Sequence, residues 1–422
     1  MMGDFGERLR LFYVFDEILP STATDTEQVV NTASALARRG HDVTLALPHK
    51  PGATVPTAPR LRDYYQVRGG FDVVTVPAQM NDWRPLQKAF HAWQAMRLEE
   101  AQAADAVYTR NLATLHAALA RGIPIFYEHF RAWPDQYPPL VPWLRWMMLH
   151  EKCLGVVLHS RLALQSFQRL GIPPAKLLVA HNGYSPERVE PRLDVASARR
   201  LLGLPNHRPL AVYAGRINER KGLESVLKLA SACPEVDFAL VGSEGHGPIE
   251  SQAATYKNVR VFPWQPFDRA VPYLYAADVV LIPPSLAPLQ QFGTTVLPMK
   301  LFLYLAVGRA ILAPRAPDTA EILEHDRNAW LVSSEQEEDI LLGFRRLIAD
   351  AGLRQRLADG ARADSIGLTW DARAERLEGF LAARLERGID GAGASPDSWD
   401  AALWRGTTAK WVGDRVRRWL RP

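Results

Sequence analysis

At 422 residues the chain is long enough for two domains with separate cores, and 47% hydrophobic with 23% charged residues is ordinary for a globular protein. The net charge of +4 is small and no concentrated basic face precedes the tail, so nucleic-acid binding is not expected. The chain shows no run of about 18 uncharged apolar residues, no signal segment and only two distant cysteines, Cys153 and Cys233; we therefore expect no membrane span, no disulfide framework and a cytoplasmic location.

The first half has the pattern of a parallel β/α domain. An apolar run at 9–15 predicts a buried strand, and 24–37 follows with apolar residues at helical spacing. Thr24 and Glu27 have the spacing of a capping box, and Gly40 suits the helix end. A strand at 43–47 completes a βαβ unit. Later strands are expected at Phe71–Val76, Ala106–Tyr108, Pro124–Tyr127, Gly155–Leu158 and Leu177–Ala180.

A stretch rich in tryptophan and methionine follows the strand at 124–127. It includes Trp133, Trp143, Trp146 and Met147. An aromatic surface here could stack on a sugar ring or touch a lipid carrier. The alternative, which the helical spacing favours, is a helix packed into the core.

The second half repeats the α/β alternation. The stretch 187–208 lacks an obvious strand and can hold the linker. Strands are expected at Pro209–Ala214, Asp237–Val241, Val259–Val261, Val279–Pro283, Ala310–Ala313 and Ala329–Val332, and helices at Gly222–Ser231, Asp268–Tyr275, Pro298–Val307 and Glu335–Asp350. We therefore expect two doubly wound Rossmann-like domains, 1–186 and 187–370, facing across a cleft, with helices at 371–422 returning to the first domain.

The segment from Tyr213 to Gly222 carries the clearest chemical signal. It leaves a strand, turns at Gly215 and is expected to enter a helix at Gly222. Arg216 and Lys221 would then lie near free backbone N–H groups at a helix start, which makes an anion site suited to a diphosphate. The alternative is a solvated loop with surface charges.

These motifs together resemble glycosyltransferase family 4. Gly-Arg, four residues and Lys-Gly at 215–222 looks like the donor-phosphate motif of that family. The segments 36–43 (LARRGHDV), 180–184 (AHNGY), 238–243 (FALVGS), 275–285 (YAADVVLIPPS) and 298–308 (PMKLFLYLAVG) resemble further family blocks in the same order. The resemblance covers most of the chain before the tail and implies the two-domain GT-B architecture.

The resemblance also implies a chemistry. The family transfers sugars with retention of anomeric configuration, and the residues aligned with Arg216 and Lys221 stabilise the leaving diphosphate. His129 corresponds to a histidine beside the donor sugar, although it could simply pack against the loop that follows. No metal and no cofactor are expected, because the sequence shows no DxD signature in the donor context and no His/Asp cluster with ligand spacing.

Six residues would complete the donor site by resemblance. Trp264 could stack on the nucleobase or pack under its turn. The set consists of Gly215, Gly242, Trp264, Thr295, Lys300 and Tyr304.

The sequence departs from the family in two places. The family has two acidic residues eight apart, and the positions that align with them carry Thr295 and Leu303. Leucine cannot accept a ribose hydrogen bond, and losing a charged acceptor costs about 1.5–3 kcal/mol. The first loop, 19–26, has no glycine, so hydroxyls rather than close backbone N–H groups would have to serve a ligand there.

The expected function is transfer of a sugar from a nucleotide-diphosphate donor to a glycan or lipid-linked acceptor. The alternatives are a GT-B accessory or binding protein that has lost turnover, and another GT-B activity such as a phosphorylase or an epimerase. The tail from Trp404 is basic and bears Trp411 and Trp419. It could lie on the anionic inner membrane face, or form a terminal helix packed on the body, which composition favours.

Overall fold

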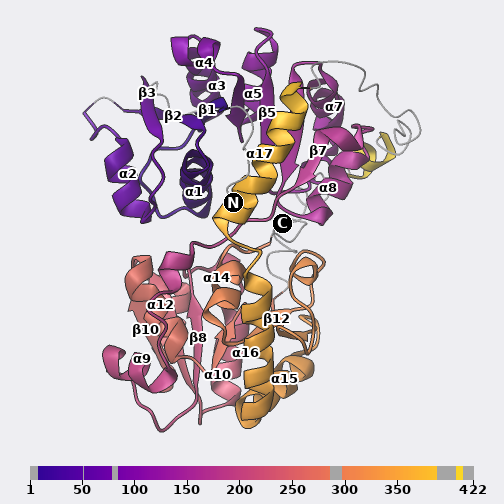
Figure 1. Ribbon diagram of the computed structural model, residues 1–422. Helices are drawn as coiled ribbons and strands as arrows, with labels where there is room; N and C mark the ends of the chain where they lie inside the picture. Colours follow the sequence, from indigo (N-terminus) through magenta and orange to yellow (C-terminus); the bar gives the residue numbers. More distant parts are fainter. Residues whose placement is uncertain (1–7, 51, 78–83, 286–296, 387–404, 412–422) are drawn as a thin grey trace. The chain divides into compact units, whose positions relative to one another are not determined.

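The computed structural model describes residues 8–50, 52–77, 84–285, 297–386 and 405–411. The chain divides into two compact units: unit 1 runs to His181 and resumes at Trp370, and unit 2 runs from Asn182 to Thr369. In each unit, helices cover both faces of a parallel sheet (Figure 1). This is the α/β architecture that the alternating pattern predicts.

The sheet of unit 1 has seven strands in the order β3-β2-β1-β4-β5-β6-β7, and all neighbours are parallel. The strand order reverses between β1 and β4, and ligands of such sheets bind at the carboxyl ends near that point. The strands are β1 (Arg10–Val14), β2 (Asp42–His49), β3 (Asp72–Pro77), β4 (Ala106–Thr109), β5 (Ile125–His129), β6 (Cys153–Leu158) and β7 (Leu177–Val179).

Four helices share a hydrophobic core with one face of this sheet: α3 (Arg84–Ala95), α5 (Leu112–Leu119), α7 (Val141–Leu149) and α8 (Arg161–Gln168). On the other face α1 (Thr24–Arg38) lies beside α17 (Trp370–Glu386), which follows unit 2 in the sequence (Figure 1). Arg38 pairs with Asp371, and Phe380 packs on Phe126 of β5. Further helices of this unit are α2 (Ala58–Tyr65), α4 (Glu99–Ala103) and α6 (Trp133–Gln136), and residues 405–411 are also helical.

Unit 2 has a six-stranded sheet in the order β10-β9-β8-β11-β12-β13. Its side chains alternate between two cores: Val212 of β8 faces one core, and Tyr213 faces the other. The strands are β8 (Leu210–Ala214), β9 (Asp237–Ser243), β10 (Val259–Pro263), β11 (Val279–Leu281), β12 (Ala310–Pro314) and β13 (Trp330–Val332).

The helices of unit 2 divide between the same two cores. One core includes α9 (Val195–Leu202), α12 (Phe267–Ala276) and α14 (Lys300–Val307), and the other includes α10 (Glu224–Ala232), α11 (Pro248–Ala253) and α15 (Glu337–Ala349). Residues of α16 (Ala351–Ser365) contribute to both cores. The sheet is therefore buried on both faces, which explains why its strands are almost continuously apolar.

Every strand expected from the sequence is present, with ends that differ by a few residues. The capping box was wrong: α1 begins at Thr24 itself after Ala23, and no side chain caps it. Asp194 caps the helix α9 inside the stretch that was expected to hold the linker. Among the residues that the structure describes, no helix is long and apolar enough to cross a bilayer.

Candidate active site

The turn after β8 is held from two sides. The hydroxyl of Tyr304, on α14, accepts a hydrogen bond from the Ala214 N–H at 2.8 Å and donates to the Ala214 carbonyl at 3.2 Å. The Tyr213 hydroxyl donates to the carbonyl of Arg216 at 2.8 Å. Tyr304 is completely buried. Two tyrosines therefore fix the end of β8 and the following turn, and Tyr304 does so from the buried side, through its hydrogen bonds to Ala214.

Two glycines bring backbone segments together at this turn. Gly215 has φ +141° and Gly242, at the end of β9, has φ +123°. A Cβ on Gly242 would lie 2.4 Å from the Gly215 carbonyl oxygen, and one on Gly215 would lie 2.5 Å from the Nζ of Lys300. A side chain at Gly242 would clash with fixed backbone, so that glycine is required by close approach as well as by φ, whereas at Gly215 the neighbour is the end of the flexible Lys300 side chain and the positive φ is the reason for glycine.

Lys300 lies at the start of α14 with its Nζ 3.5 Å from the ring centroid of Tyr213. Burial, together with the charge of Lys221, lowers the pKa of Lys300 well below its usual value. Within the described part of the chain no carboxylate lies in ion-pair range of Lys300 or Lys221. The buried amine therefore lies directly beside Gly215 without a carboxylate partner among the described residues.

Lys221 and Arg216 add positive charge on the exposed side of the turn. Surrounding protein atoms and the neighbouring Arg216 lower the pKa of Lys221, although its side chain keeps solvent-exposed surface. Arg216 is also exposed and lies 3.4 Å from Glu244, which follows β9. Arg216, Lys221 and Lys300 bring positive charge to the two glycine turns and form a site for an anion such as a diphosphate, although Glu244 and Glu219 also lie at these turns.

The helix after this turn begins later than expected. Glu219–Lys221 forms a short 3-10 turn that ends at Gly222, and α10 begins only at Glu224. The N–H groups of Ser225 and Val226 bond to the carbonyls of Gly222 and Leu223. Those two N–H groups are therefore already engaged within the chain.

Trp264 lies beside the second glycine turn. Its backbone N–H donates to the Ser243 carbonyl at 2.7 Å, and its side chain is 40% exposed after the end of β10. That exposure leaves part of the side chain accessible, and stacking on a nucleobase stays a prediction. Leu303 is half-buried and packs on the apolar core, while Thr295 lies outside the described residues.

His129 occupies the corresponding edge of the sheet in unit 1. It is the last residue of β5, is 6% exposed and lies 4.8 Å from the ring of Trp133. Its Nδ1 accepts from the Phe130 N–H at 2.9 Å, which leaves the proton on Nε2. Burial, with the charges of Arg110 and His159, lowers its pKa well below the usual value, so the imidazole is neutral.

The strand was expected to end at Tyr127 but continues to His129. Glu128 and His129 therefore point to opposite faces of the sheet. Glu128 is completely buried, where it pairs with Arg373 of α17, accepts from the side chain of Gln28 at 2.8 Å and accepts from His159. Glu128 is thus part of a buried network under β5 that joins α1, β6 and α17.

Three residues at this edge of unit 1 were missed by the sequence analysis. Asp16 follows β1, pairs with Lys88 of α3 and accepts from the amide of Asn111 at 2.6 Å. The side chain of Asp16 is 8% exposed. An acidic residue directly after an apolar strand was a signal for Asp16; its partners could be found only from the fold.

The first loop of unit 1 uses its hydroxyls internally. The Tyr65 hydroxyl bonds to the backbone of Ser21 and to the Thr26 side chain, and Thr26 also donates to the Ala23 carbonyl at 2.7 Å. The Ser21 hydroxyl accepts from the Ala23 N–H at 3.2 Å and lies 3.3 Å from the Thr26 hydroxyl. Burial raises the pKa of Tyr65 to about 12. Of the loop hydroxyls proposed for a ligand, those of Ser21 and Thr26 are already engaged in holding the loop.

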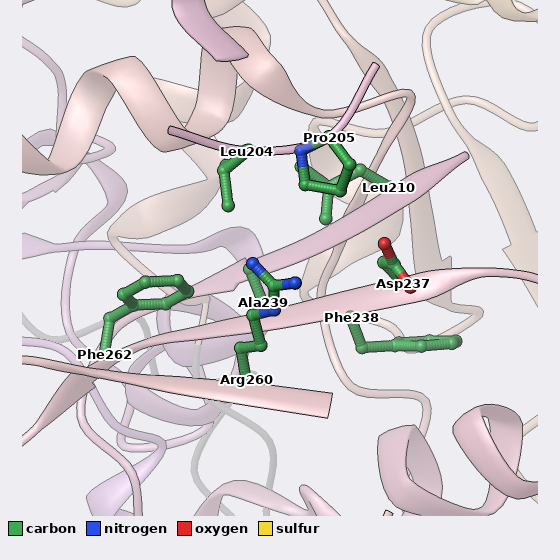
Figure 2. Close-up of a pocket in the computed structure, with 8 residues that line it drawn as sticks. All are labelled: Leu204, Pro205, Leu210, Asp237, Phe238, Ala239, Arg260 and Phe262. Carbon is green, nitrogen blue, oxygen red and sulfur yellow. The ribbon is translucent and has the colours of Figure 1, made fainter. Parts of the chain in front are cut away.

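A pocket in unit 2 lies away from these charges. Figure 2 shows it between the connection that follows α9 and the strands β8, β9 and β10. Leu210 and Asp237 begin their strands there, at the opposite end from Gly215 and Gly242. Arg260 is the one basic side chain among the residues that line this pocket. The pocket therefore lies at the amino-terminal ends of these strands, away from the glycine turns at their carboxyl ends.

Two family models match the chain. The model described as Glycosyltransferase Family 4 matches residues 26–188, and the model described as Glycosyl transferases group 1 matches residues 194–364. An uncharacterized glycosyltransferase from Methanocaldococcus jannaschii is 22% identical over 52% of this chain and 57% of its own length. The putative colanic acid biosynthesis glycosyl transferase WcaI from Escherichia coli is 30% identical over 37% of this chain and 39% of its own length. The chain thus spans about half the length, or less, of these relatives.

Solved structures have the same fold. HepE from Anabaena, crystallised with UDP and glucose, superposes with a TM-score of 0.67 at 15% identity, covering 89% of this chain and all of its own. That likeness concerns the fold alone, whereas the two models match both halves in the order that the sequence motifs indicate. The chain belongs to the GT-B glycosyltransferases of family 4.

Proposed function

We propose that the protein transfers a sugar from a nucleoside-diphosphate donor to a glycan or lipid-linked acceptor. The observation that carries the proposal is the grouping of Arg216, Lys221 and Lys300 around Gly215, with Arg216 paired to Glu244. The fold likeness to an Anabaena protein crystallised with UDP and glucose supports a nucleotide sugar as donor. Two buried free cysteines agree with a cytoplasmic location.

The three cations would act on the leaving group. As the glycosidic bond breaks, negative charge develops on the diphosphate, and fixed positive charges stabilise that state more than the intact donor. Lys300 is positioned by its contact with Tyr213, so little reorganisation is needed when charge develops. With this much positive charge the reaction needs neither a metal ion nor a cofactor.

Unit 1 would supply the groups that meet the sugar and the acceptor. A neutral His129 with its proton on Nε2 is a hydrogen-bond donor for a sugar hydroxyl, and its low pKa makes it unsuitable as a cation there. Transfer with retention, in which the departing phosphate takes the acceptor proton, fits a site where the carboxylate of Asp16 is already paired with Lys88.

A second function is supported by one observation. Leu303 presents an apolar side chain where a carboxylate would hold the ribose, and it packs on the core. A protein that binds nucleotide sugars without turning them over would be consistent with this loss. Both functions share the anion site at Gly215.

The test separates binding from turnover. Titration calorimetry with UDP, UDP-glucose, GDP-mannose and dTDP-glucose would identify the donor, and release of nucleotide from the bound donor would measure hydrolysis or transfer. Binding with turnover and an unchanged anomeric configuration supports the proposed transferase. Binding without turnover, across acceptor sugars and lipid-linked sugars, supports the accessory protein, and no binding of any nucleotide would refute both.

A further inference from the structure

Three neighbouring helices of unit 1 present an exposed aromatic surface. They are α3, α5 and α7, which cover one face of the sheet and contact one another in that order. Trp93 of α3 is 45% exposed, and Trp143 and Trp146 of α7 are 37% and 48% exposed. We name this surface the tryptophan face; it comprises Leu86, Trp93, His116, Leu140, Trp143 and Trp146.

The tryptophan face is separate from the core side of the same helices. In α7 the residues Leu144, Met147 and Met148 are buried against the sheet, which confirms a core role for part of the stretch. Trp143 and Trp146 of the same helix keep a large part of their surface exposed. The ring of His116, on α5, lies 5.9 Å from Trp143 and 5.7 Å from Trp146, so the aromatic surface continues from α7 onto α5.

The charge of these helices has one sign. The three helices contain no aspartate or glutamate, although acidic residues make up 46 of the 422 in the chain. Arg97, two residues beyond the end of α3, stacks on Trp93 with its guanidinium carbon 4.6 Å from the ring centroid. Arg145 of α7 is half-buried beside the two exposed tryptophans. The exposed residues Glu99, Glu100 and Glu151 lie in the segments that follow α3 and α7, outside the three helices. Exposed tryptophans on helices that carry cations and no carboxylates are the composition of a surface for anionic lipid.

We propose that the tryptophan face docks on the surface of a bilayer that contains anionic lipids. Tryptophan is enriched at the boundary between headgroups and acyl chains, and exposed apolar surface of this kind indicates a partner. A second copy of the chain is a poorer occupant, because a two-fold contact would bring together two sets of helices that carry cations such as Arg145 and no acidic residue. The inference goes beyond the transfer reaction and does not depend on it.

The basic tail is a different part of the chain. The indole N–H of Trp411 donates to the carbonyl of Gln136 at 2.9 Å, so the described end of the tail is bound to unit 1 near α6. Residues 412–422 lie outside the described residues. The experiment must therefore distinguish the tryptophan face from the tail.

Sedimentation of the full chain with vesicles tests the proposal. We expect binding to vesicles of phosphatidylcholine with 30 mol% phosphatidylglycerol, and at least about tenfold weaker binding to pure phosphatidylcholine. The triple variant Trp93→Ser, Trp143→Ser, Trp146→Ser should bind the anionic vesicles at least about tenfold more weakly than the wild type. Arg97→Glu should weaken binding and reduce its dependence on salt.

Two exposed apolar residues of unit 2 provide control variants for the vesicle experiment. Leu342→Ser and Ile366→Ser remove side chains that are 59% and 77% exposed in unit 2, and should bind vesicles like the wild type. Circular dichroism must show that each variant is folded. The proposal is overturned if the triple variant binds as the wild type does, or if binding is lost only in Arg417→Glu with Arg418→Glu in the tail. It is also overturned if the three tryptophans instead support a dimer by light scattering in the absence of lipid.

Discussion

Lys300 illustrates at the residue scale how a binding site can hold charge at a cost to the free protein. Its amine is buried near Lys221 without a carboxylate partner in the described residues, so its pKa in the folded chain lies below that in the unfolded chain. Lys300 therefore lowers the stability of the folded chain at pH values below its unfolded pKa, because the unfolded chain binds the proton more readily there. A bound diphosphate would supply the missing counter-charge.

This cost predicts the behaviour of Lys300→Met. At pH 7 the variant should melt at a higher temperature, by roughly 2–4 °C for each kcal/mol relieved in a unit of this size. The same variant should lose most nucleotide affinity. Thermal unfolding and calorimetry measure the two effects. Lys228→Met, which removes an exposed lysine paired with Glu337, is the control and should change neither. A lower melting temperature for Lys300→Met would contradict the unpaired charge.

Arg216 and Lys221 give a second prediction at the residue scale. Arg216→Ala and Lys221→Ala should each reduce transfer by about two to three orders of magnitude, because each removes a charge that stabilises the leaving group. Stability should change little, since both side chains are exposed and the pair between Arg216 and Glu244 is a surface pair.

The control for lost charge is Arg220→Ala, on the same exposed turn. It should keep near wild-type activity by the same assay of nucleotide release. Wild-type rates in both Arg216→Ala and Lys221→Ala would remove the phosphate assignment from this turn.

At the scale of elements, the pair of Glu128 and Arg373 joins β5 to α17. Both side chains are at most 1% exposed, and the two residues are 245 positions apart in the chain. Burial opposes ionisation, but the charges of Arg373 and His159 hold the pKa of Glu128 well below its usual range. The position of the strand that ends in His129 therefore depends on a helix from the far end of the chain.

Glu128→Gln should destabilise unit 1 by about 3–5 kcal/mol, because Arg373 would keep a buried charge without its partner. Adding Arg373→Met should recover a large part of the loss, as a double-mutant cycle in urea would show. Asp371→Asn, on the same helix but in an exposed pair with Arg38, should cost less than about 1 kcal/mol.

The same pair sets a dependence on pH. Since the pKa of Glu128 is lowered by folding, its contribution is present above the unfolded pKa and is lost as the pH falls toward the folded value. Wild-type stability should therefore fall on acidification more steeply than that of the double variant. Parallel slopes would show that Glu128 is not ionised in the folded chain.

At the scale of the whole molecule, each unit has its own sheet and its own cores. The donor residues that could be described, Gly215, Arg216, Lys221, Gly242, Trp264, Lys300 and Tyr304, all belong to unit 2, whereas His129 belongs to unit 1. A nucleotide bound at the glycine turns should therefore stabilise unit 2 more than unit 1. Scanning calorimetry should show UDP at 100 times its Kd raising the stability of unit 2 by about 2.7 kcal/mol.

Hydrogen exchange can assign that effect. Protection by UDP should concentrate at the turn after β8 and at the start of α14. Protection confined to unit 1 would place the nucleotide elsewhere. Lys221→Ala is the control in which the added protection should disappear.

The sequence by itself determined the alternation of strands and helices, because apolar periodicity and glycine turns act over a few neighbouring residues. It also indicated Gly215, Arg216 and Lys221, which lie on one continuous turn. Only the tertiary structure decided that Tyr304, 90 positions from Ala214, fixes that turn. Likewise, only the fold turned Glu128 away from the edge where His129 lies and placed Arg373 against it. Such contacts depend on strand length and on which distant elements pack together, and local sequence patterns do not contain that information.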